Sequence, residues 1–188
     1  MTFILISGEM NVGKTSVCNK LHSRIAADQS FTVRNAPQNA SNMSKIDFIA
    51  HYEKNGKHIV LNVPSDDNGR MGQFANCLDG LAQKGVRPDI IITTIRENNN
   101  VGYPMSRMLA LLDAFANGTP NLVNYYKQNI ESITSFAPTS LCHNALVLHL
   151  EKQQVSGNKA NKENALAPYW DNKAETAKQM LDFALARL

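Results

Sequence analysis

Cysteine is scarce in this sequence, and its placement argues against a disulfide framework or a zinc site. The three cysteines, Cys18, Cys77 and Cys142, are far apart among 188 residues and include no CxxC pair. Disulfide scaffolds and structural zinc sites both use closely spaced cysteines, and zinc sites often add a pair of histidines. The pattern therefore predicts free thiols in a reducing compartment.

Long apolar runs and a strong excess of one charge are also lacking. The N-terminus, Met-Thr-Phe-Ile-Leu-Ile-Ser-Gly, has no basic segment before its short apolar run, unlike a secretory leader. No stretch approaches the roughly 20 apolar residues that cross a bilayer. The net charge of +3 permits an anionic partner without identifying one. We expect a cytoplasmic protein with no membrane span.

Strand-like and helix-like segments alternate along the chain. Apolar runs typical of strands cover 3–7, 31–33, 46–52, 57–63, 89–94, 122–126 and 145–150. Helical periodicity covers 14–27, 71–84, 104–116, 128–136 and 173–188. Asn55-Gly56 between two strand-like runs predicts a hairpin, and the polar stretch 151–165 predicts a surface excursion. The alternation predicts an α/β fold with a mostly parallel central sheet and helices on both faces.

The strongest motif lies between the first strand and the first helix. Residues 8 to 15 read Gly-Glu-Met-Asn-Val-Gly-Lys-Thr and match the phosphate-binding pattern GxxxxGK[ST]. In this pattern the glycines let backbone N–H groups point at phosphate oxygens, the lysine contacts the β- and γ-phosphates, and the threonine hydroxyl binds Mg²⁺. The expected nucleotide-binding residues are Gly8, Asn11, Val12, Gly13, Lys14, Thr15 and Ser16. The motif predicts that residues 1–188 form a single P-loop NTPase domain that binds ATP and Mg²⁺.

Phosphoryl chemistry also needs a carboxylate near the metal, usually at the end of a neighbouring strand. The strand Ile59-Val-Leu-Asn62 carries an asparagine at that place, and Asp66 and Asp67 follow in the next loop. Asp66 with Gly69 also matches the loose DxxG pattern that senses a γ-phosphate. Two interpretations stay open: catalytic carboxylates, with Asp66 joining Thr15 as a metal ligand, or a solvated turn.

Several segments resemble ParA/MinD-type ATPases, the group that includes plasmid partition and stability proteins. Pro37-Gln38-Asn39-Ala40-Ser41 resembles the DPQ…NAS stretch of that group, and the strand ending at Asn62-Val-Pro64 resembles its Asp-Thr-Pro-Pro turn. The resemblance covers about the first 115 residues. It implies a nucleotide-dependent switch, a homodimer, and action through nonspecific DNA contact or a partner protein.

The chain departs from that family where the family keeps charged groups. Glu9 stands where those loops carry an extra lysine that reaches across a dimer, and Arg34 and Ala36 replace acids beside the Pro-Gln step. Asn62 replaces the acid at the strand end. Because such groups orient water or hold the metal shell, we expect slow Mg²⁺-dependent hydrolysis.

Alternatives remain for the reaction and the partner. GTP is disfavoured because no NKxD pattern follows a late strand. A small-molecule kinase would use arginines to neutralise the transferred phosphate, and Arg70, Arg96 and Arg107 are the candidates. A non-catalytic nucleotide-binding module would fit the missing acids. Lysines 152, 159 and 162 suit either a DNA-contacting face or a solvated loop.

Overall fold

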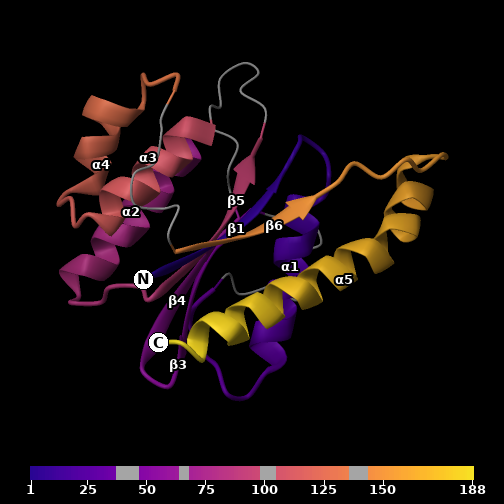
Figure 1. The fold of residues 1–188 in the computed structure, drawn as a ribbon, viewed down its shortest axis with the longest axis horizontal. Coiled ribbons are helices and arrows are strands. Elements are labelled where there is room, and N and C mark those ends of the chain that lie inside the picture. Colours follow the sequence, from indigo (N-terminus) through magenta and orange to yellow (C-terminus); the bar gives the residue numbers. More distant parts are fainter. Residues whose placement is uncertain (37–46, 64–67, 98–104, 136–143) are drawn as a thin grey trace.

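The computed structural model describes residues 1–36, 47–63, 68–97, 105–135 and 144–188 (Figure 1). Its strands are β1 (Thr2–Gly8), β2 (Thr32–Asn35), β3 (Ile49–Lys54), β4 (Lys57–Asn62), β5 (Ile90–Arg96) and β6 (Ala145–Leu150). Its helices are α1 (Lys14–Ala27), α2 (Asn68–Gln83), α3 (Met105–Ala116), α4 (Leu122–Tyr125) and α5 (Lys159–Leu185). A π-helical turn over Tyr126–Ile130 continues α4. The chain is therefore an α/β protein.

The strands form one six-stranded sheet in the order β2-β3-β4-β5-β1-β6. Strands β4, β5, β1 and β6 are parallel neighbours, whereas β3 is antiparallel to both β2 and β4. The sheet is thus mostly parallel, as the alternation of strands and helices predicts. Strand β1 lies between β5 and β6, so the loop that follows β1 opens between two neighbouring strand ends.

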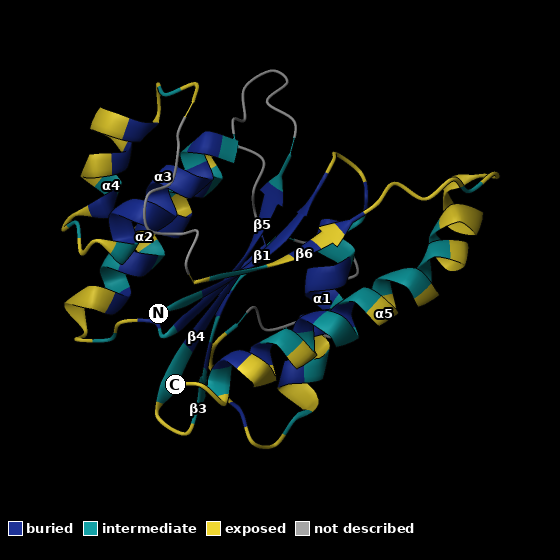
Figure 2. Cartoon of the chain, in the orientation of Figure 1, coloured by how far each residue is buried: buried dark blue, intermediate teal, exposed yellow. Residues whose placement is uncertain are grey.

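Helices cover both faces of the sheet, as expected. Ile4 and Ile6 of β1 belong to the core under α1 and α5, whereas Phe3 and Leu5 belong to the core under α2, α3 and α4. This alternation follows from the period of two in a strand. Figure 2 shows the buried strands between the two helical layers. Burial on both faces explains why β1 reads as a continuous apolar run.

Local signals located several elements accurately. Helix 14–27 and strand 145–150 have the predicted bounds, and the β3–β4 hairpin turns at Asn55-Gly56 with φ angles of +53° and +75°. Positive φ at both central residues is the type I′ geometry that favours Asn-Gly. The strand predicted over 46–52 begins later, because β3 starts at Ile49.

Three predictions from the second half of the chain were wrong. The helix predicted over 128–136 is absent from the described residues, because the π turn ends at Ile130 and residues 131–135 are not helical. Residues 122–126 form helix α4 and the start of the π turn rather than a strand, because Leu122, Tyr126 and Ile130 all face one core at helical spacing. The Asp79 carboxylate of α2 accepts hydrogen bonds from the Leu122 and Val123 N–H groups and caps that helix at a distance. The excursion over 151–165 is helical from Lys159, where the Asn158 side chain accepts from the Asn161 N–H as an N-cap.

Among the helices of the described residues, none combines the length and the apolar character needed to cross a membrane.

Candidate functional site

The loop after β1 adopts a backbone that only a few residue types accept. Gly8, Asn11 and Gly13 have φ angles of +153°, +63° and +94°. A Cβ at Gly8 would lie 2.7 Å from the Leu150 carbonyl oxygen, so a larger residue would clash with β6. These positive φ values curl the chain tightly between β1 and α1. The motif therefore lies in the strand–loop–helix context that phosphate binding requires.

The N-terminus of α1 presents donors at the end of this loop. Gly13 is the N-cap residue, and no described side chain caps the helix. The first N–H groups of a helix have no partner within the helix, and the helix dipole adds partial positive charge there. Thr15 and Ser16 are half-buried in this first turn, so their side chains line the same end. The arrangement suits an anion with several oxygens.

Lys14 lies folded over the loop. Its ammonium donates to the carbonyl oxygens of Gly8 at 2.9 Å and Glu9 at 2.7 Å, and only 8% of the residue is exposed. The long side chain thus places a positive charge inside the curl formed by Gly8 and Glu9. A phosphate entering the curl would meet this ammonium, since carbonyl dipoles are weaker partners than a charged oxygen.

Asp47 is a carboxylate at this site that the sequence patterns did not reveal. The Thr15 hydroxyl donates to Asp47 Oδ1 at 3.3 Å, and Asp47 Oδ2 forms an ion pair with Arg70 of α2. Asp47 falls in a segment that we predicted as strand, which hid its role. One signal was available: Asp47 is the only acidic residue between Asp28 and Glu53.

The predicted acidic pair, Asp66 and Asp67, lies outside the described residues. Asn62, the residue at the expected place of a strand-end acid, is buried and donates to Thr93 Oγ1 at 3.0 Å. Because β5 separates β4 from β1, Asn62 ends a strand that is not adjacent to the loop-bearing strand. Its amide instead fastens β4 to β5.

The two strands beside β1 bring other polar groups to the loop. Arg96 of β5 is paired in register with Gly8, and the next residue, Glu97, donates its N–H to the Gly8 carbonyl at 3.3 Å. The Glu97 carboxylate meets His149 Nδ1 of β6 at 2.7 Å, and Ser7 Oγ lies 3.5 Å from the same nitrogen. Since both partners meet one ring nitrogen, this group does not form a serine–histidine–carboxylate relay.

The kinase arginines are dispersed. Arg70 lies near the loop because it pairs with Asp47. Arg96 lies near it because it is the register partner of Gly8 on the neighbouring strand. Arg107 of α3 instead donates to the Ile133 carbonyl oxygen at 3.2 Å and fixes the segment after the π turn. The three arginines that we considered as a phosphate-neutralising set are thus not brought together.

The family positions that differ in this chain have their own local roles. Glu9 is exposed at the loop tip, while Arg34 on edge strand β2 pairs with Glu53 of β3 at 2.7 Å. Ala36 packs at the edge of the core under α1 and α5. The Pro37–Ser41 segment that carries part of the resemblance lies outside the described residues.

Cys18 lies beneath the loop, one turn into α1. It is fully buried, and burial raises the pKa of its thiol to about 12 although nearby Lys14 lowers it. The thiolate is the nucleophilic form of cysteine, so Cys18 is a core residue without reactive character.

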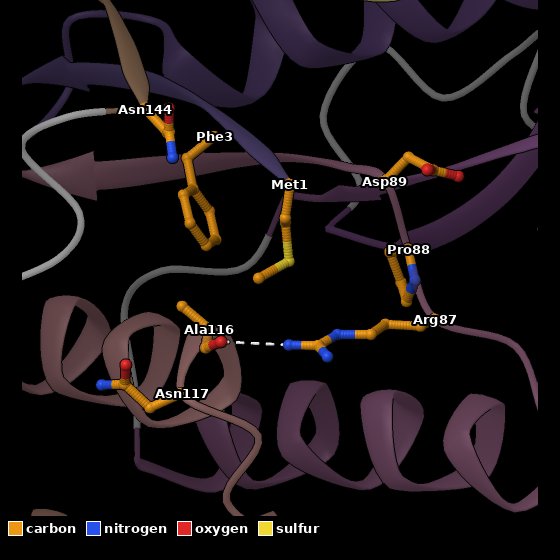
Figure 3. A pocket seen from close by; sticks show the side chains of 8 residues that line it. All are labelled: Met1, Phe3, Arg87, Pro88, Asp89, Ala116, Asn117 and Asn144. Carbon is orange, nitrogen blue, oxygen red and sulfur yellow. Dashed lines mark hydrogen bonds between the residues drawn. The ribbon is translucent and has the colours of Figure 1, made fainter. Parts of the chain in front are cut away.

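A separate cavity of about 500 Å³ lies at the other end of the sheet (Figure 3). Met1, Asp89 and Asn144, which line it, directly precede β1, β5 and β6. Arg87 crosses this cavity and donates to the Ala116 carbonyl oxygen at 3.0 Å. Ligands of parallel sheets bind beyond the carboxyl ends of the strands, which favours the Gly8–Thr15 loop over this cavity.

Comparisons of the chain with protein-family models, curated proteins and solved structures found no significant match. The functional argument therefore rests on the geometry of the Gly8–Thr15 loop and its neighbours.

Proposed function

We propose that this protein is a P-loop protein that binds ATP with Mg²⁺ and acts as a ParA/MinD-like nucleotide-dependent switch with slow hydrolysis. The observation that carries the proposal is the curled Gly8–Thr15 loop between β1 and α1, with the Lys14 ammonium inside it. This combination supplies uncapped helix N–H groups, a helix dipole and a buried cation to one place. A triphosphate is the ligand that uses all three.

The residues beside the loop fit Mg²⁺. Thr15 Oγ1 and Asp47 Oδ1 are hard oxygen donors 3.3 Å apart. Mg²⁺ binds such oxygens at about 2.1 Å in octahedral geometry, which places adjacent ligands about 3 Å apart. Thr15 and Asp47 would hold the ion, directly or through a bound water, and the ion would offset charge on the β- and γ-phosphates. Asp66 remains a further candidate ligand, and Asp66 and Asp67 remain candidate catalytic carboxylates.

We propose that hydrolysis is slow because few of the described side chains around the loop could activate a water molecule. Asn62 is used in a hydrogen bond to Thr93, and Glu97 is paired with His149. The switch reading extends to a homodimer and to DNA or a partner protein, as the family resemblance implies. The kinase alternative needs several arginines around one phosphate, and Arg107 is committed elsewhere.

Substitution of Lys14 tests the proposal. We expect Lys14→Ala to weaken ATP binding at least about 100-fold, because two charge-assisted hydrogen bonds to phosphate are worth about 3 kcal/mol together. Calorimetric titration with ATP and Mg²⁺ measures the effect. Lys84→Ala, at an exposed lysine just after α2 and outside the loop, is the control and should bind normally. Equal affinity of Lys14→Ala and the wild-type protein would refute nucleotide binding at this loop.

Hydrolysis assays separate the candidate functions. Turnover raised by DNA or by a protein partner supports the switch. A turnover rate that DNA and proteins leave unchanged but one metabolite raises supports a kinase. ATP binding without turnover under any condition supports a non-catalytic module.

A further inference from the structure

The only tryptophan of the chain lies against the phosphate-binding loop. A Cβ at Gly13 would lie 2.1 Å from the Trp170 Nε1 atom and 2.6 Å from its Cε2. The five-membered edge of the indole is therefore in direct contact with Gly13, the residue before Lys14. Gly13 must be glycine for this contact as well as for its φ angle of +94°.

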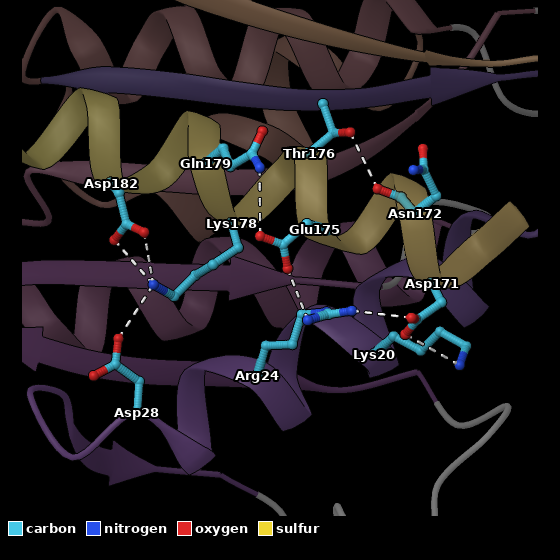
Figure 4. Close-up of polar contacts among 10 residues, drawn as sticks. All are labelled: Lys20, Arg24, Asp28, Asp171, Asn172, Glu175, Thr176, Lys178, Gln179 and Asp182. Atoms are coloured by element: carbon cyan, nitrogen blue, oxygen red, sulfur yellow. Dashed lines mark hydrogen bonds and ion pairs between the residues drawn. The ribbon is translucent and has the colours of Figure 1, made fainter. Parts of the chain in front are cut away.

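Contacts on both sides hold Trp170 in place. The preceding residue, Tyr169, accepts a hydrogen bond from the Glu151 N–H at 3.0 Å, just beyond β6. The following residue, Asp171, meets Arg24 at 3.0 Å and Lys20 at 3.6 Å, both on α1 (Figure 4). This part of α5 is thus fastened to the segment just after β6 and to α1, the helix that follows the loop. The indole position is built into the fold.

The indole N–H is a buried donor that lacks a partner among the described residues. Its Nε1 atom is shielded from solvent and makes no hydrogen bond there. An unpaired buried donor is unfavourable, and buried tryptophan N–H groups usually find an acceptor. The nearest functional element is the loop whose N–H groups would surround phosphate oxygens.

We propose that Trp170 is part of the nucleotide site and that its indole N–H, which the fold covers, donates to a phosphate oxygen once the loop rearranges around the bound triphosphate. This inference rests on the proposed function, because the acceptor belongs to the nucleotide. Helix α5 then contributes a ligand-contacting residue to a site otherwise built from β1, the loop, α1 and Asp47. The occupied loop is thereby linked to α5, which extends from Lys159 to Leu185.

Tryptophan fluorescence tests the proposal directly, because Trp170 is the only tryptophan and can be excited selectively over the five tyrosines. We expect ATP with Mg²⁺, and inorganic tripolyphosphate alone, to change the emission of the wild-type protein with the same midpoint as calorimetric binding. Trp170→Phe keeps most of the ring but lacks the donor, and should weaken both ligands about tenfold. Tyr125→Phe, at an exposed tyrosine of α4 on the opposite face of the sheet, is the control and should keep wild-type affinity. Thermal melting of each variant checks that the fold is retained.

The outcomes separate this inference from the proposed function. If ATP binds by calorimetry while Trp170→Phe keeps wild-type affinity, the donor role is wrong and nucleotide binding stands. The donor role is also wrong if ATP changes the emission but tripolyphosphate binds Trp170→Phe and the wild-type protein with equal affinity. If neither ligand produces heat or an emission change in the wild-type protein, the proposed function itself fails.

Discussion

At the scale of single residues, Asp47 brings a carboxylate to the Gly8–Thr15 loop from outside the motif. Its Oδ1 accepts from Thr15 and its Oδ2 pairs with Arg70, so one side chain joins the loop to α2. Asp47→Asn keeps the shape but removes the charge. We expect the apparent Mg²⁺ affinity in the presence of ATP to fall about 10- to 100-fold, the range for residues that orient metal ligands.

Titration of Mg²⁺ against ATP binding measures this effect. Glu53→Gln is the matched control, because Glu53 is the next acid along the chain and pairs with Arg34 on β2, away from the loop. A wild-type Mg²⁺ midpoint in Asp47→Asn would mean that other groups, with Asp66 and Asp67 the first to test, complete the metal shell.

The two residues that changed the picture of the site, Asp47 and Trp170, share one property. Each lies far from the loop in the sequence but contacts it in the fold: Asp47 contacts Thr15, and Trp170 contacts Gly13. Spacing within a motif reveals residues that are close in sequence, which is why Lys14 and Thr15 stand out as candidates in the sequence. It carries no information on which distant side chain folds back onto the motif.

At the scale of elements, the interface of α1 and α5 combines a polar rim with an apolar centre. Arg24 bridges Asp171 and Glu175 at 3.0 and 2.7 Å, and Lys178 lies between Asp28 and Asp182 (Figure 4). Leu181 is fully buried beneath this rim. Exposed ion pairs contribute about 0–1 kcal/mol, whereas a buried leucine contributes far more.

We therefore expect Leu181→Ala to lower the free energy of unfolding by about 2–5 kcal/mol and Asp171→Asn by about 1 kcal/mol or less. Urea denaturation followed by circular dichroism measures both. Equal losses in the two variants would contradict this expectation and show that the ion pairs contribute as much as the apolar centre.

The helices and strands also show which local sequence signals are sufficient to predict the bounds of an element. Helix α1 and strand β6 follow from their own periodicity and have the predicted bounds. Helix α4 does not, because its cap is the Asp79 carboxylate of α2 and its apolar face is short. The first turns of α5 are exposed and lack an apolar stripe, so the only local sign of that helix start was Asn158 as N-cap.

At the scale of the whole molecule, the carboxyl end of the sheet gathers groups from distant parts of the chain. Lys14 follows β1, Asp47 precedes β3, Glu97 follows β5 and Trp170 belongs to α5. The opposite end carries the cavity lined by Met1 and Arg87. Parallel order thus concentrates the polar chemistry at one end, as expected from the direction of the strands.

Stability of the whole fold should also depend on pH through His22, which lies between α1 and the sheet. Its ring hydrogen-bonds to the Tyr52 hydroxyl, and burial lowers the pKa of His22 from its ordinary value of 6.5. The neighbours Cys18 and Tyr52 have pKa values raised by burial and stay neutral in acid. Because the unfolded chain binds the His22 proton more readily, stability is retained above about pH 6.5 and falls as the pH drops toward the lowered value.

We expect the melting temperature of the wild-type protein to decrease from pH 7 to pH 5, and His22→Gln to flatten this decrease because glutamine does not titrate. His51, whose pKa is also lowered by burial and by nearby His58, acts in the same direction, so a partial slope should remain. His149→Gln is the control, since the His149 side chain is 51% exposed. An unchanged slope in His22→Gln would assign the acid sensitivity to other groups and leave the His22–Tyr52 hydrogen bond a purely structural contact.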